Sequence, residues 1–402
     1  MWFKAKKEVK ADPHAIEDFL TRAVSGVYPN RQEVSQMLSS GKQLSMYLGI
    51  DPTGPTLHLG HAIAIRKLRA FQKMGHKVIL LIGSFTAQIG DPTDKLAARV
   101  RLTEEQVLAN AALYKKQASA LLDFEGSNPA EIRYNGTWLS PMTLSDVVDL
   151  ASKTTVQEML KRDMFETRMK EGKPIHLHEF LYPLLQGYDS VAMQIDGEVG
   201  GNDQLFNMLT GRDLVRAYLD KEKFVLTMKL LADSSGKKMG KTEGNMAALS
   251  DAPAEVFGKV MSWTDGMILS GFELCTDRPT ADLKVFEERL QKENPRDIKL
   301  ELAEDIVRAH FGEKAAKASR ESFTSTFSSA VFPEDALSIK VTDVVTMRDF
   351  VVKVTGGSNS EATRLFEQRA IENEQGEKIT DPSSKPTPGN YRIGKRHFGK
   401  LE

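Results

Sequence analysis

Two histidines separated by two residues are the first candidates for chemistry in this chain. His58 and His61 flank Leu59 and Gly60 in the stretch "YLGIDPTGPTLHLGHAIAI", which begins at Tyr47. If a helix begins there, both imidazoles lie at its positive N-terminal end and can donate hydrogen bonds to phosphate oxygens. Gly60 also leaves room for a nucleotide ring against the backbone. Two polar loop histidines are the simpler interpretation of the motif alone, but the predicted strand before it and helix after it favour nucleotide binding.

A loop rich in glycine and lysine is the second candidate. It reads "SSGKKMGKTEGN" over residues 234–245, where Lys238 and Lys241 supply positive charge and Thr242 supplies a hydroxyl. Such a loop can close over a triphosphate and stabilise the charge on departing pyrophosphate. The spacing does not match a Walker A loop. Taken alone, the motif is more typical of a solvated turn.

Polar residues also interrupt an apolar helix, "HEFLYPLLQGYDSVAM". Tyr182, Gln186 and Asp189 are spaced at i, i+4 and i+7, so they share one face. A buried helix does not carry an uncompensated carboxylate. The face is therefore either exposed to water or lines a polar pocket, and the leucines on both sides favour the pocket.

A further polar stretch follows another predicted strand. It reads "GGNDQ" from Gly200 to Gln204, and its glycines allow close approach to the backbone. Asn202 could cap the next helix, while Asp203 and Gln204 could bond a ribose hydroxyl and a small polar substrate. An ordinary turn between a strand and a helix is the simpler interpretation of this motif alone.

The stretch "GDPTDKLAAR" places Asp91, Lys95 and Arg99 in a loop after a strand. All of these polar stretches fall at predicted strand ends or helix starts. In parallel α/β folds ligands bind at those places, so the motifs support one another.

A βαβ unit is predicted to position the histidines. The pattern predicts a strand over 44–49, a helix over 60–73 that ends before Gly75, and a strand over 78–82. The last strand is a continuous apolar run, which is typical of a parallel strand buried on both faces.

The chain is predicted to open with an amphipathic helix. Asp12 and Pro13 are suited to its first positions. Its apolar face is predicted to contain Ile16, Phe19, Leu20 and Val24.

The middle of the chain is predicted to be mostly helical. Thr103 and Gln106 form a capping box before a long helix toward Leu122, and further helices are predicted over 143–151 and 155–172. Because the βα pattern resumes only near Met193, residues 123–175 are interpreted as a helical insertion in the nucleotide fold.

Three domains are predicted. Strands near 193–199 and 224–231 complete a Rossmann-like α/β domain over residues 1–230. A signature loop and a helical domain follow over 231–335. A small separate α+β domain is predicted over 336–402, where the composition changes.

Composition limits the classes of function. The chain has 402 residues, a formal net charge of -1 and one cysteine, Cys275. A contact with nucleic acid would therefore need local basic patches. The cysteine count fits a reducing cytosol, and neither a signal peptide nor an apolar run long enough for a membrane is visible. These features predict a cytoplasmic protein with no membrane partner, and the spacing of His, Cys and acidic residues predicts no metal site.

Taken together, these stretches resemble the class I aminoacyl-tRNA synthetases, and most closely the bacterial tyrosyl-tRNA synthetases. The stretch HLGH at 58–61 matches the HIGH signature of that family, and KMGKT at 238–242 matches the KMSKS signature. "YLGIDPT", "IGDPT", the helix with Asp189 and "GGNDQ" are similar to family stretches in the same order. Leu48 and Gly240 depart from the pattern, since relatives can carry polar side chains there.

The resemblance implies roles for the candidate residues. Tyrosine would be bound by Tyr47, Thr86, Asp91, Tyr182, Gln186, Asp189 and Gln204. ATP would be bound by Gly49, Asp51, Gly60, Gly200, Asp203 and Met239. The phosphates and the leaving pyrophosphate would be contacted by Thr53, His58, His61, Lys95, Arg99, Lys238, Lys241 and Thr242. tRNA would be bound by Arg392, Lys395, Arg396 and Lys400 in a domain like that of a ribosomal protein.

Within the amino-acid site, the resemblance implies that Tyr47 and Asp189 bond the phenol hydroxyl. It implies that Asp91, Tyr182 and Gln186 hold the ammonium group.

The resemblance also implies an activity and its partners. Tyrosine would react with ATP to give tyrosyl-adenylate and pyrophosphate, and would then pass to the 3′ end of tRNA(Tyr). Magnesium would arrive with ATP, and no prosthetic group is implied. The inserted segment would join two copies in a homodimer. The alternatives are a sibling enzyme for tryptophan, a small nucleotidyltransferase, and a non-catalytic RNA-binding protein on a synthetase shell.

Overall fold

The computed structural model describes residues 9–92, 102–232, 246–328, 336–394 and 397–402. Contacts within the chain divide it into two compact units, Met1–Ala316 and Lys317–Glu402. Within the described ranges, none of the helices is long and apolar enough to span a membrane.

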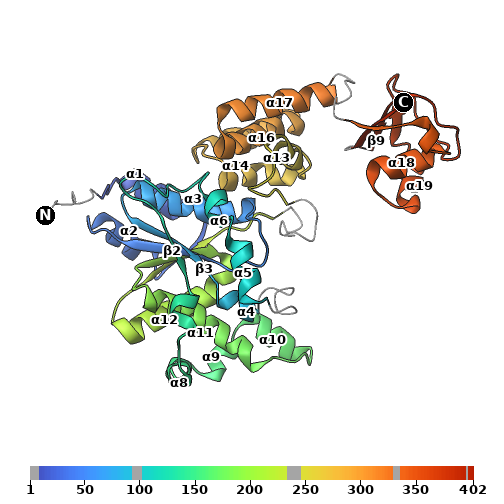
Figure 1. The fold of residues 1–402 in the computed structure, drawn as a ribbon. Coiled ribbons are helices and arrows are strands. Elements are labelled where there is room, and N and C mark those ends of the chain that lie inside the picture. Colours follow the sequence, from blue (N-terminus) through green and yellow to red (C-terminus); the bar gives the residue numbers. More distant parts are fainter. Residues whose placement is uncertain (1–8, 93–101, 233–245, 329–335, 395–396) are drawn as a thin grey trace. The chain divides into compact units, whose positions relative to one another are not determined.

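A mixed sheet forms the centre of the first unit (Figure 1). Among the described residues it has six strands in the order β1-β6-β5-β2-β3-β4. All neighbours are parallel except β1 and β6, which are antiparallel. The strands are β1 (Val24–Tyr28), β2 (Ser45–Ile50), β3 (Lys77–Ile82), β4 (Glu131–Tyr134), β5 (Gly197–Gly201) and β6 (Phe224–Met228). The predicted α/β class with a Rossmann-like parallel sheet is confirmed.

Helices cover both faces of this sheet. Helix α3 (Leu59–Lys73) packs on β2, β3 and β5, while α12 (Leu205–Leu219) packs on β5 and β6 and against α11 (Leu177–Ala192). Figure 1 shows α3 on one side of the sheet and α11 and α12 on the other. Helix α3 begins at the predicted place, and Gly75 follows it with a φ of 90°.

The other helices of the first unit are mostly short. They are α1 (Pro13–Thr21), α2 (Arg31–Ser39), α4 (Thr86–Ile89), α5 (Glu104–Ala111), α6 (Tyr114–Ala118), α7 (Gly136–Leu139), α8 (Leu144–Ala151), α9 (Val156–Leu160), α10 (Asp163–Lys170), η2 (Asn202–Gln204), α13 (Pro253–Met261), η4 (Asp265–Met267), α14 (Ile268–Cys275), α15 (Asp282–Leu290) and α16 (Pro295–Phe311).

The opening helix is shorter than predicted. Asp12 caps α1 and Pro13 begins it, as expected, but the helix ends at Thr21 and Val24 is the first residue of β1. Ala23 between them has a φ of 58°, a left-handed conformation that stops a helix. The prediction that Val24 belongs to the helical face is wrong, because β1 pairs with β6 far along the chain.

The insertion also contains a strand of the main sheet. Residues 131–134 form β4, which pairs in parallel with β3. The expectation that the βα pattern resumes only near Met193 is therefore wrong. This edge strand reads "EIRY" and is only partly buried, so it lacks the apolar run that marks a central strand.

Two predicted long helices are each broken in two. Thr103 and Gln106 form the expected capping box, but α5 ends at Ala111 and α6 follows from Tyr114. In the same way, α9 and α10 replace one helix over 155–172. Tyr114, at the start of α6, donates its hydroxyl to the Gly54 carbonyl (2.6 Å) in the loop before the histidines.

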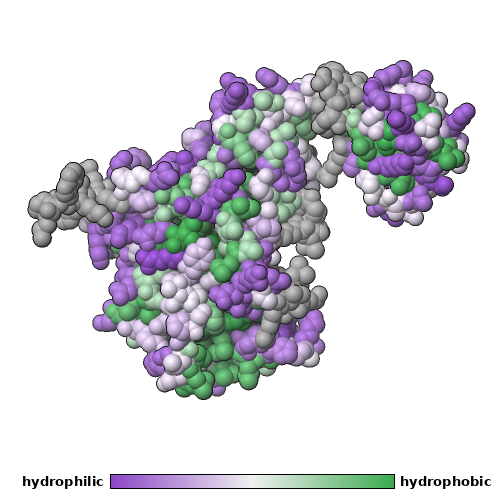
Figure 2. All heavy atoms as spheres, viewed as in Figure 1, coloured by the Kyte–Doolittle hydropathy of each residue, from purple (hydrophilic) through white to green (hydrophobic). Residues whose placement is uncertain are grey.

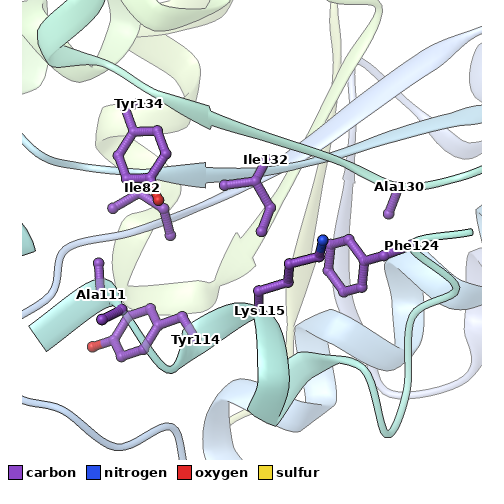
Figure 3. A pocket seen from close by; sticks show the side chains of 9 residues that line it. Ile82, Ala111, Tyr114, Lys115, Phe124, Ala130, Ile132 and Tyr134 are labelled. Carbon is purple, nitrogen blue, oxygen red and sulfur yellow. The ribbon is translucent and has the colours of Figure 1, made fainter.

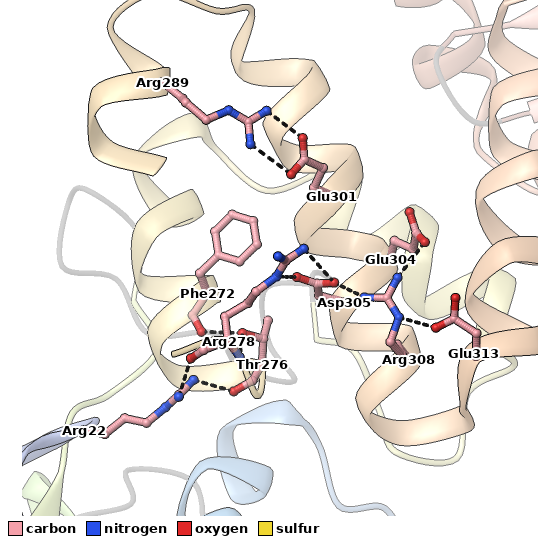
Figure 4. A network of polar contacts seen from close by, with 10 residues as sticks. All are labelled: Arg22, Phe272, Thr276, Arg278, Arg289, Glu301, Glu304, Asp305, Arg308 and Glu313. Atoms are coloured by element: carbon pink, nitrogen blue, oxygen red, sulfur yellow. Dashed lines mark hydrogen bonds and ion pairs between the residues drawn. The ribbon is translucent and has the colours of Figure 1, made fainter. Parts of the chain in front are cut away.

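Hydrogen bonds to backbone carbonyls join the helical part of the first unit to the sheet part (Figure 4). The Arg22 guanidinium, after α1, donates to the carbonyls of Thr276 (2.6 Å) and Arg278. Lys67 of α3 is buried and donates to the Phe19 and Arg22 carbonyls at 2.6 and 2.9 Å. The start of the chain therefore holds α3 and α14 together.

The second unit is a small α+β fold that begins within α17 (Glu313–Ser328). Among its described residues, four strands lie in the order β7-β10-β9-β8. Phe350 and Phe366 fill its core with apolar strand residues. The remaining elements are β7 (Leu337–Ile339), η5 (Val341–Asp343), α18 (Met347–Thr355), α19 (Asn359–Glu367), β8 (Ile371–Asn373), β9 (Gly389–Ile393) and β10 (His397–Leu401).

Candidate active site

The two histidines form a reciprocal cap at the start of α3. His58 is the N-cap residue, and its Nδ1 accepts a hydrogen bond from the Gly60 N–H (3.1 Å). The Nδ1 of His61 accepts from the His58 N–H (3.2 Å), and the two rings lie 4.0 Å apart. A Cβ on Gly60 would lie 2.9 Å from the His58 ring, so glycine is required for this cap.

The cap determines which nitrogen carries the proton. In a neutral imidazole one nitrogen accepts and the other donates. Because both Nδ1 atoms accept from backbone N–H groups, both Nε2 atoms carry a hydrogen. The helix start thus presents two donors beside a positive helix end, an arrangement suited to phosphate oxygens.

A continuous hydrogen-bond network connects β2, α4 and α11. Asp51, after β2, accepts from the hydroxyls of Thr86 (2.7 Å) and Tyr182 (2.9 Å). Burial raises the pKa of Asp51 to about 7, an increase to which the Asp91 charge adds and which the two hydrogen bonds oppose. A Cβ on Gly83 would lie 1.8 Å from the Asp51 carboxylate, so the turn after β3 needs glycine there.

Asp189 lies at the other end of this hydrogen-bond network. Its Oδ1 accepts from the Trp138 indole N–H (2.8 Å) and its Oδ2 from the Asn135 side-chain amide (3.2 Å). The same amide donates to the Thr86 hydroxyl (3.0 Å), which closes the connection to Asp51. Burial raises the pKa of Asp189, and the two donors oppose that rise. Asp189 is only 2% exposed, which excludes the solvent-exposed alternative for this helix face.

Asn135 and Trp138 are site residues that the sequence reasoning missed. They follow β4, the strand that the reasoning also missed, at the carboxyl edge of the sheet. Recognising "EIRY" as a strand would have placed the next residues at a ligand-binding edge.

Tyr47 lies on β2 and is completely buried. Its hydroxyl is 3.0 Å from the Ser190 hydroxyl, on the residue after Asp189. Burial raises the pKa of Tyr47, and the charges of Glu198 and Asp189 add to the increase. Tyr47 is therefore held as a neutral phenol.

The side chains of Gln186, Gln204 and Asp91 are joined through Asn207, a buried residue of α12. The Asn207 side-chain amide donates to the carbonyl oxygens of Gln186 (2.9 Å) and Gln204 (3.0 Å). Gln204 in turn donates to Asp91 (2.7 Å), which is 3.6 Å from the Arg162 guanidinium. The sequence reasoning missed two further contacts: Asn207, three residues after Gln204, and Arg162, at the start of α10.

The remaining candidates of the nucleotide side lie at strand ends. Gly49 is near the end of β2, and Thr53 follows with its N–H donating to the Asp51 carbonyl (2.8 Å). Gly200 lies on β5, where a Cβ would meet Met208 at 3.0 Å. Asp203 is exposed in η2. Asn202 does not cap α12 as expected; its Oδ1 instead accepts from the Ser25 hydroxyl (3.4 Å).

Several predicted site residues lie outside the described ranges. They are Lys95, Arg99, Lys238, Met239, Lys241, Thr242, Lys395 and Arg396.

The described basic candidates of the second unit share one face of its sheet. Arg392 on β9 and Lys400 on β10 are on the face opposite buried Tyr391 and Leu401, because successive strand residues alternate. Each has an acidic neighbour: Arg392 is 3.9 Å from Glu372, and Lys400 is 2.6 Å from Glu402.

A separate cavity of about 330 Å³ lies between α5, α6 and the strands β3 and β4 (Figure 3). Its walls include Ile132, Phe124 and Tyr134, with the Lys115 ammonium 5.7 Å from the centre of the Phe124 ring. None of the predicted site residues within the described ranges lines it.

Comparisons with known proteins identify the family and the fold. The model of the tRNA synthetases class I (W and Y) matches residues 39–328. The Thermotoga maritima tyrosine--tRNA ligase is 42% identical over 97% of this chain and 98% of its own length. Tyrosine--tRNA ligase 2 of Vibrio parahaemolyticus is 41% identical over 95% and 97%.

Solved structures show the same fold. A C-terminally truncated mitochondrial tyrosyl-tRNA synthetase of Aspergillus nidulans aligns with a TM-score of 0.64 and 23% identity, over 78% of this chain and 93% of that one. The Archaeoglobus fulgidus tyrosyl-tRNA synthetase, complexed with L-tyrosine, aligns with a TM-score of 0.60 and 21% identity, over 77% and 100%. The histidine cap, the parallel sheet and these matches together place the chain in the family of class I tRNA synthetases for tryptophan and tyrosine.

Proposed function

We propose that this chain activates L-tyrosine with ATP and transfers it to tRNA(Tyr). The tyrosine carboxylate attacks the α-phosphorus of ATP, which gives tyrosyl-adenylate and releases pyrophosphate. A ribose hydroxyl at the 3′ end of the tRNA then attacks the activated carbonyl and releases AMP. The relatives named above, similar over nearly the whole chain, support this reaction.

The buried Asp189 is the single observation that best supports tyrosine as the amino-acid substrate. Its oxygens are oriented by Trp138 and Asn135, and the Tyr47 hydroxyl lies beside the neighbouring Ser190. Such a pocket bonds a phenol hydroxyl and leaves buried polar groups unpaired when phenylalanine enters. Tyrosyl-tRNA synthetases are themselves the well-known case of this discrimination.

The other side chains of the network are suited to the amino acid's charged groups. Asp91, Tyr182 and Gln186 would hold the ammonium group, with Thr86 supporting Asp51 and Gln204 near the carboxylate. This assignment is supported by two sets of hydrogen bonds. Tyr182 and Thr86 both bond Asp51, and Gln186 is connected to Gln204 and Asp91 through Asn207.

Catalysis would come from positioning and from stabilising charge on the phosphates. The Nε2 donors of His58 and His61 are suited to the phosphate oxygens of ATP, with Thr53 close by. Asp203 and the backbone at Gly49, Gly60 and Gly200 would bind the nucleoside, with Asp51 beside it. Mg²⁺ would enter bound to ATP as part of that substrate.

Exchange of radioactive pyrophosphate into ATP, measured with each common amino acid in turn, tests the activation step. Exchange with tyrosine alone supports the proposal. Exchange with tryptophan alone would identify the sibling activity, and no exchange with any amino acid would contradict catalysis.

We also propose that the second unit binds tRNA through the sheet face that carries Arg392 and Lys400. Solvent-facing cations beside the partly buried Phe398 are suited to phosphates and bases. Removing residues 336–402 should leave exchange with tyrosine within about twofold, while tRNA charging falls by about tenfold or more. Equal losses in both assays would contradict this separation.

A second copy of the chain is the partner we propose for the segment 123–175. Exposed apolar side chains gather there, including Leu144 (80% exposed), Val148 (61%) and Val156 (64%). Figure 2 shows hydrophobic residues at the lower end of the view, where Figure 1 places α8 and α9. Val148→Glu should shift the mass measured by sedimentation from dimer to monomer.

The single buried cysteine, Cys275, fits a cytoplasmic location.

A further inference from the structure

An ion pair that none of the predicted roles uses lies directly behind the amino-acid site. Lys223, just before β6, has no exposed surface, and Glu198 on β5 is 2% exposed. Their side chains form an ion pair, and the Lys223 ammonium also donates to the Ser190 hydroxyl (2.7 Å) and the Met208 carbonyl (3.3 Å).

The fold leaves space for this ion pair, although burying its two charges is energetically unfavourable. A Cβ on Gly211 of α12 would lie 2.7 Å from the Lys223 ammonium, so a larger residue there would displace the ammonium group. Burial lowers the pKa of Lys223, and the Glu198 carboxylate opposes that effect. A buried ion pair is often no more stabilising than apolar side chains of the same volume. Stability alone therefore gives little reason for a pair at this position.

Both members contact residues of the proposed amino-acid site. Lys223 donates to Ser190, which is hydrogen-bonded to Tyr47, and its ammonium lies 5.7 Å from the centre of the Tyr47 ring. Glu198 accepts from the side-chain amide of Gln186 (3.4 Å).

We propose that Lys223 and Glu198 are positioning residues for tyrosine: Lys223 directs the Tyr47 proton toward the substrate phenol, and Glu198 fixes the orientation of the Gln186 carboxamide. The inference rests on the proposed activation of tyrosine.

Lys223 acts through the direction of the hydrogen bond between Ser190 and Tyr47. A hydroxyl that accepts from an ammonium becomes a stronger donor. Ser190 therefore donates to the Tyr47 oxygen. The Glu198 carboxylate is a second acceptor beside the Tyr47 hydroxyl, and its ion pair with Lys223 weakens it as an acceptor, so that the Tyr47 proton can go to the phenol oxygen of the substrate. The substrate hydroxyl can then donate to Asp189, which completes one chain of donors from Lys223 to that carboxylate.

Glu198 acts on Gln186 by accepting from its NH₂ group. Asn207 donates to the Gln186 carbonyl oxygen at the other side. With the NH₂ group held by a carboxylate, the carbonyl oxygen stays on the Asn207 side, where its second lone pair can accept from an ammonium group. A glutamine at position 198 could donate instead, and would permit the reversed amide.

The test compares three variants: Glu198→Gln, Lys223→Met and the double variant. The exchange assay gives KM for tyrosine, KM for ATP, and the ratio of kcat/KM for tyrosine to that for phenylalanine. Thermal unfolding gives Tm. Lys223→Met should lower Tm, because Glu198 is left unpaired. It should also raise KM for tyrosine and lower the tyrosine-to-phenylalanine ratio by about tenfold each, with KM for ATP unchanged. The double variant should recover Tm but keep the altered KM and ratio.

Lys299→Met is the matched control. Lys299 is a buried lysine that donates to the Trp263 carbonyl (2.7 Å) and to Asp265 (2.6 Å) in the helical part of the first unit. This variant should lower Tm without changing KM for tyrosine or the ratio.

A double variant with normal KM and ratio overturns the inference, since the pair would then be structural only. If the double variant does not fold, Glu198→Gln decides: an unchanged KM for tyrosine overturns the inference, and an increase supports it. Failure of the proposed function itself is distinguishable, because the wild-type protein would then show no exchange with tyrosine.

Discussion

The two ends of the candidate site differ in how their functional side chains are oriented. At the amino-acid end, other side chains orient them; at the histidine end, backbone N–H groups do. Asp189 is oriented by Trp138 and Asn135, which come from another part of the chain. His58 and His61 are oriented by N–H groups within three residues of themselves.

The difference corresponds to what each end must recognise. A phenol differs from a benzene ring by one hydroxyl, so selection requires buried polar groups that lose a partner when the wrong ligand binds. The phosphates of ATP are the same whichever amino acid is activated, so binding them needs donors and positive potential rather than discrimination. A local helix cap supplies those donors without a surrounding network.

Asp189→Ala should give the largest effect and would break the amino-acid end. The change leaves Trp138 and Asn135 without their buried acceptor and removes the partner of the phenol. We expect kcat/KM for tyrosine to fall by about 10³-fold, with a much smaller change for phenylalanine, in the exchange assay. Near-normal kinetics with tyrosine would contradict this pocket.

His58→Asn separates capping from phosphate binding at the histidine end. Asparagine is a good N-cap residue, so Tm should stay close to that of the wild type. The Nε2 donor is lost, and kcat for exchange should fall by about 10²-fold with KM for tyrosine unchanged. His58→Ala is the comparison, which should lose about 1 kcal/mol of stability as well. A normal kcat for His58→Asn would show that the ring serves only as a cap.

Asp51→Asn tests how the buried carboxyl group of Asp51 changes the free energy of unfolding with pH. The pKa of Asp51 is raised to about 7 by burial, above the value of about 3.9 in an unfolded chain. The folded protein therefore binds an extra proton between these values, and its free energy of unfolding falls as pH rises toward 7. The loss is a few kcal/mol at most, roughly 1–4.

Urea unfolding of the wild type and Asp51→Asn at about pH 5 and about pH 8 measures this term. The variant should show a smaller loss of stability between the two conditions than the wild type. Parallel pH dependence in the two proteins would mean that Asp51 does not carry the extra proton.

Local chemistry was readable from the sequence alone. Asp12 caps α1 and Thr103 caps α5 as predicted, because a cap depends on residues within one turn. The continuous apolar run of β3 also identified a central strand, because burial on both faces requires it. The spacing of Tyr182, Gln186 and Asp189 likewise placed them on one helix face.

Tertiary structure decided which distant side chains meet these residues. Trp138 and Asn135 reach Asp189 only because β4 joins the sheet, and β4 has no apolar run to reveal it. Lys223 meets Glu198 because β5 and β6 are parallel neighbours. Such contacts depend on which distant strands pair with each other. That pairing cannot be predicted from the spacing of residues along the chain.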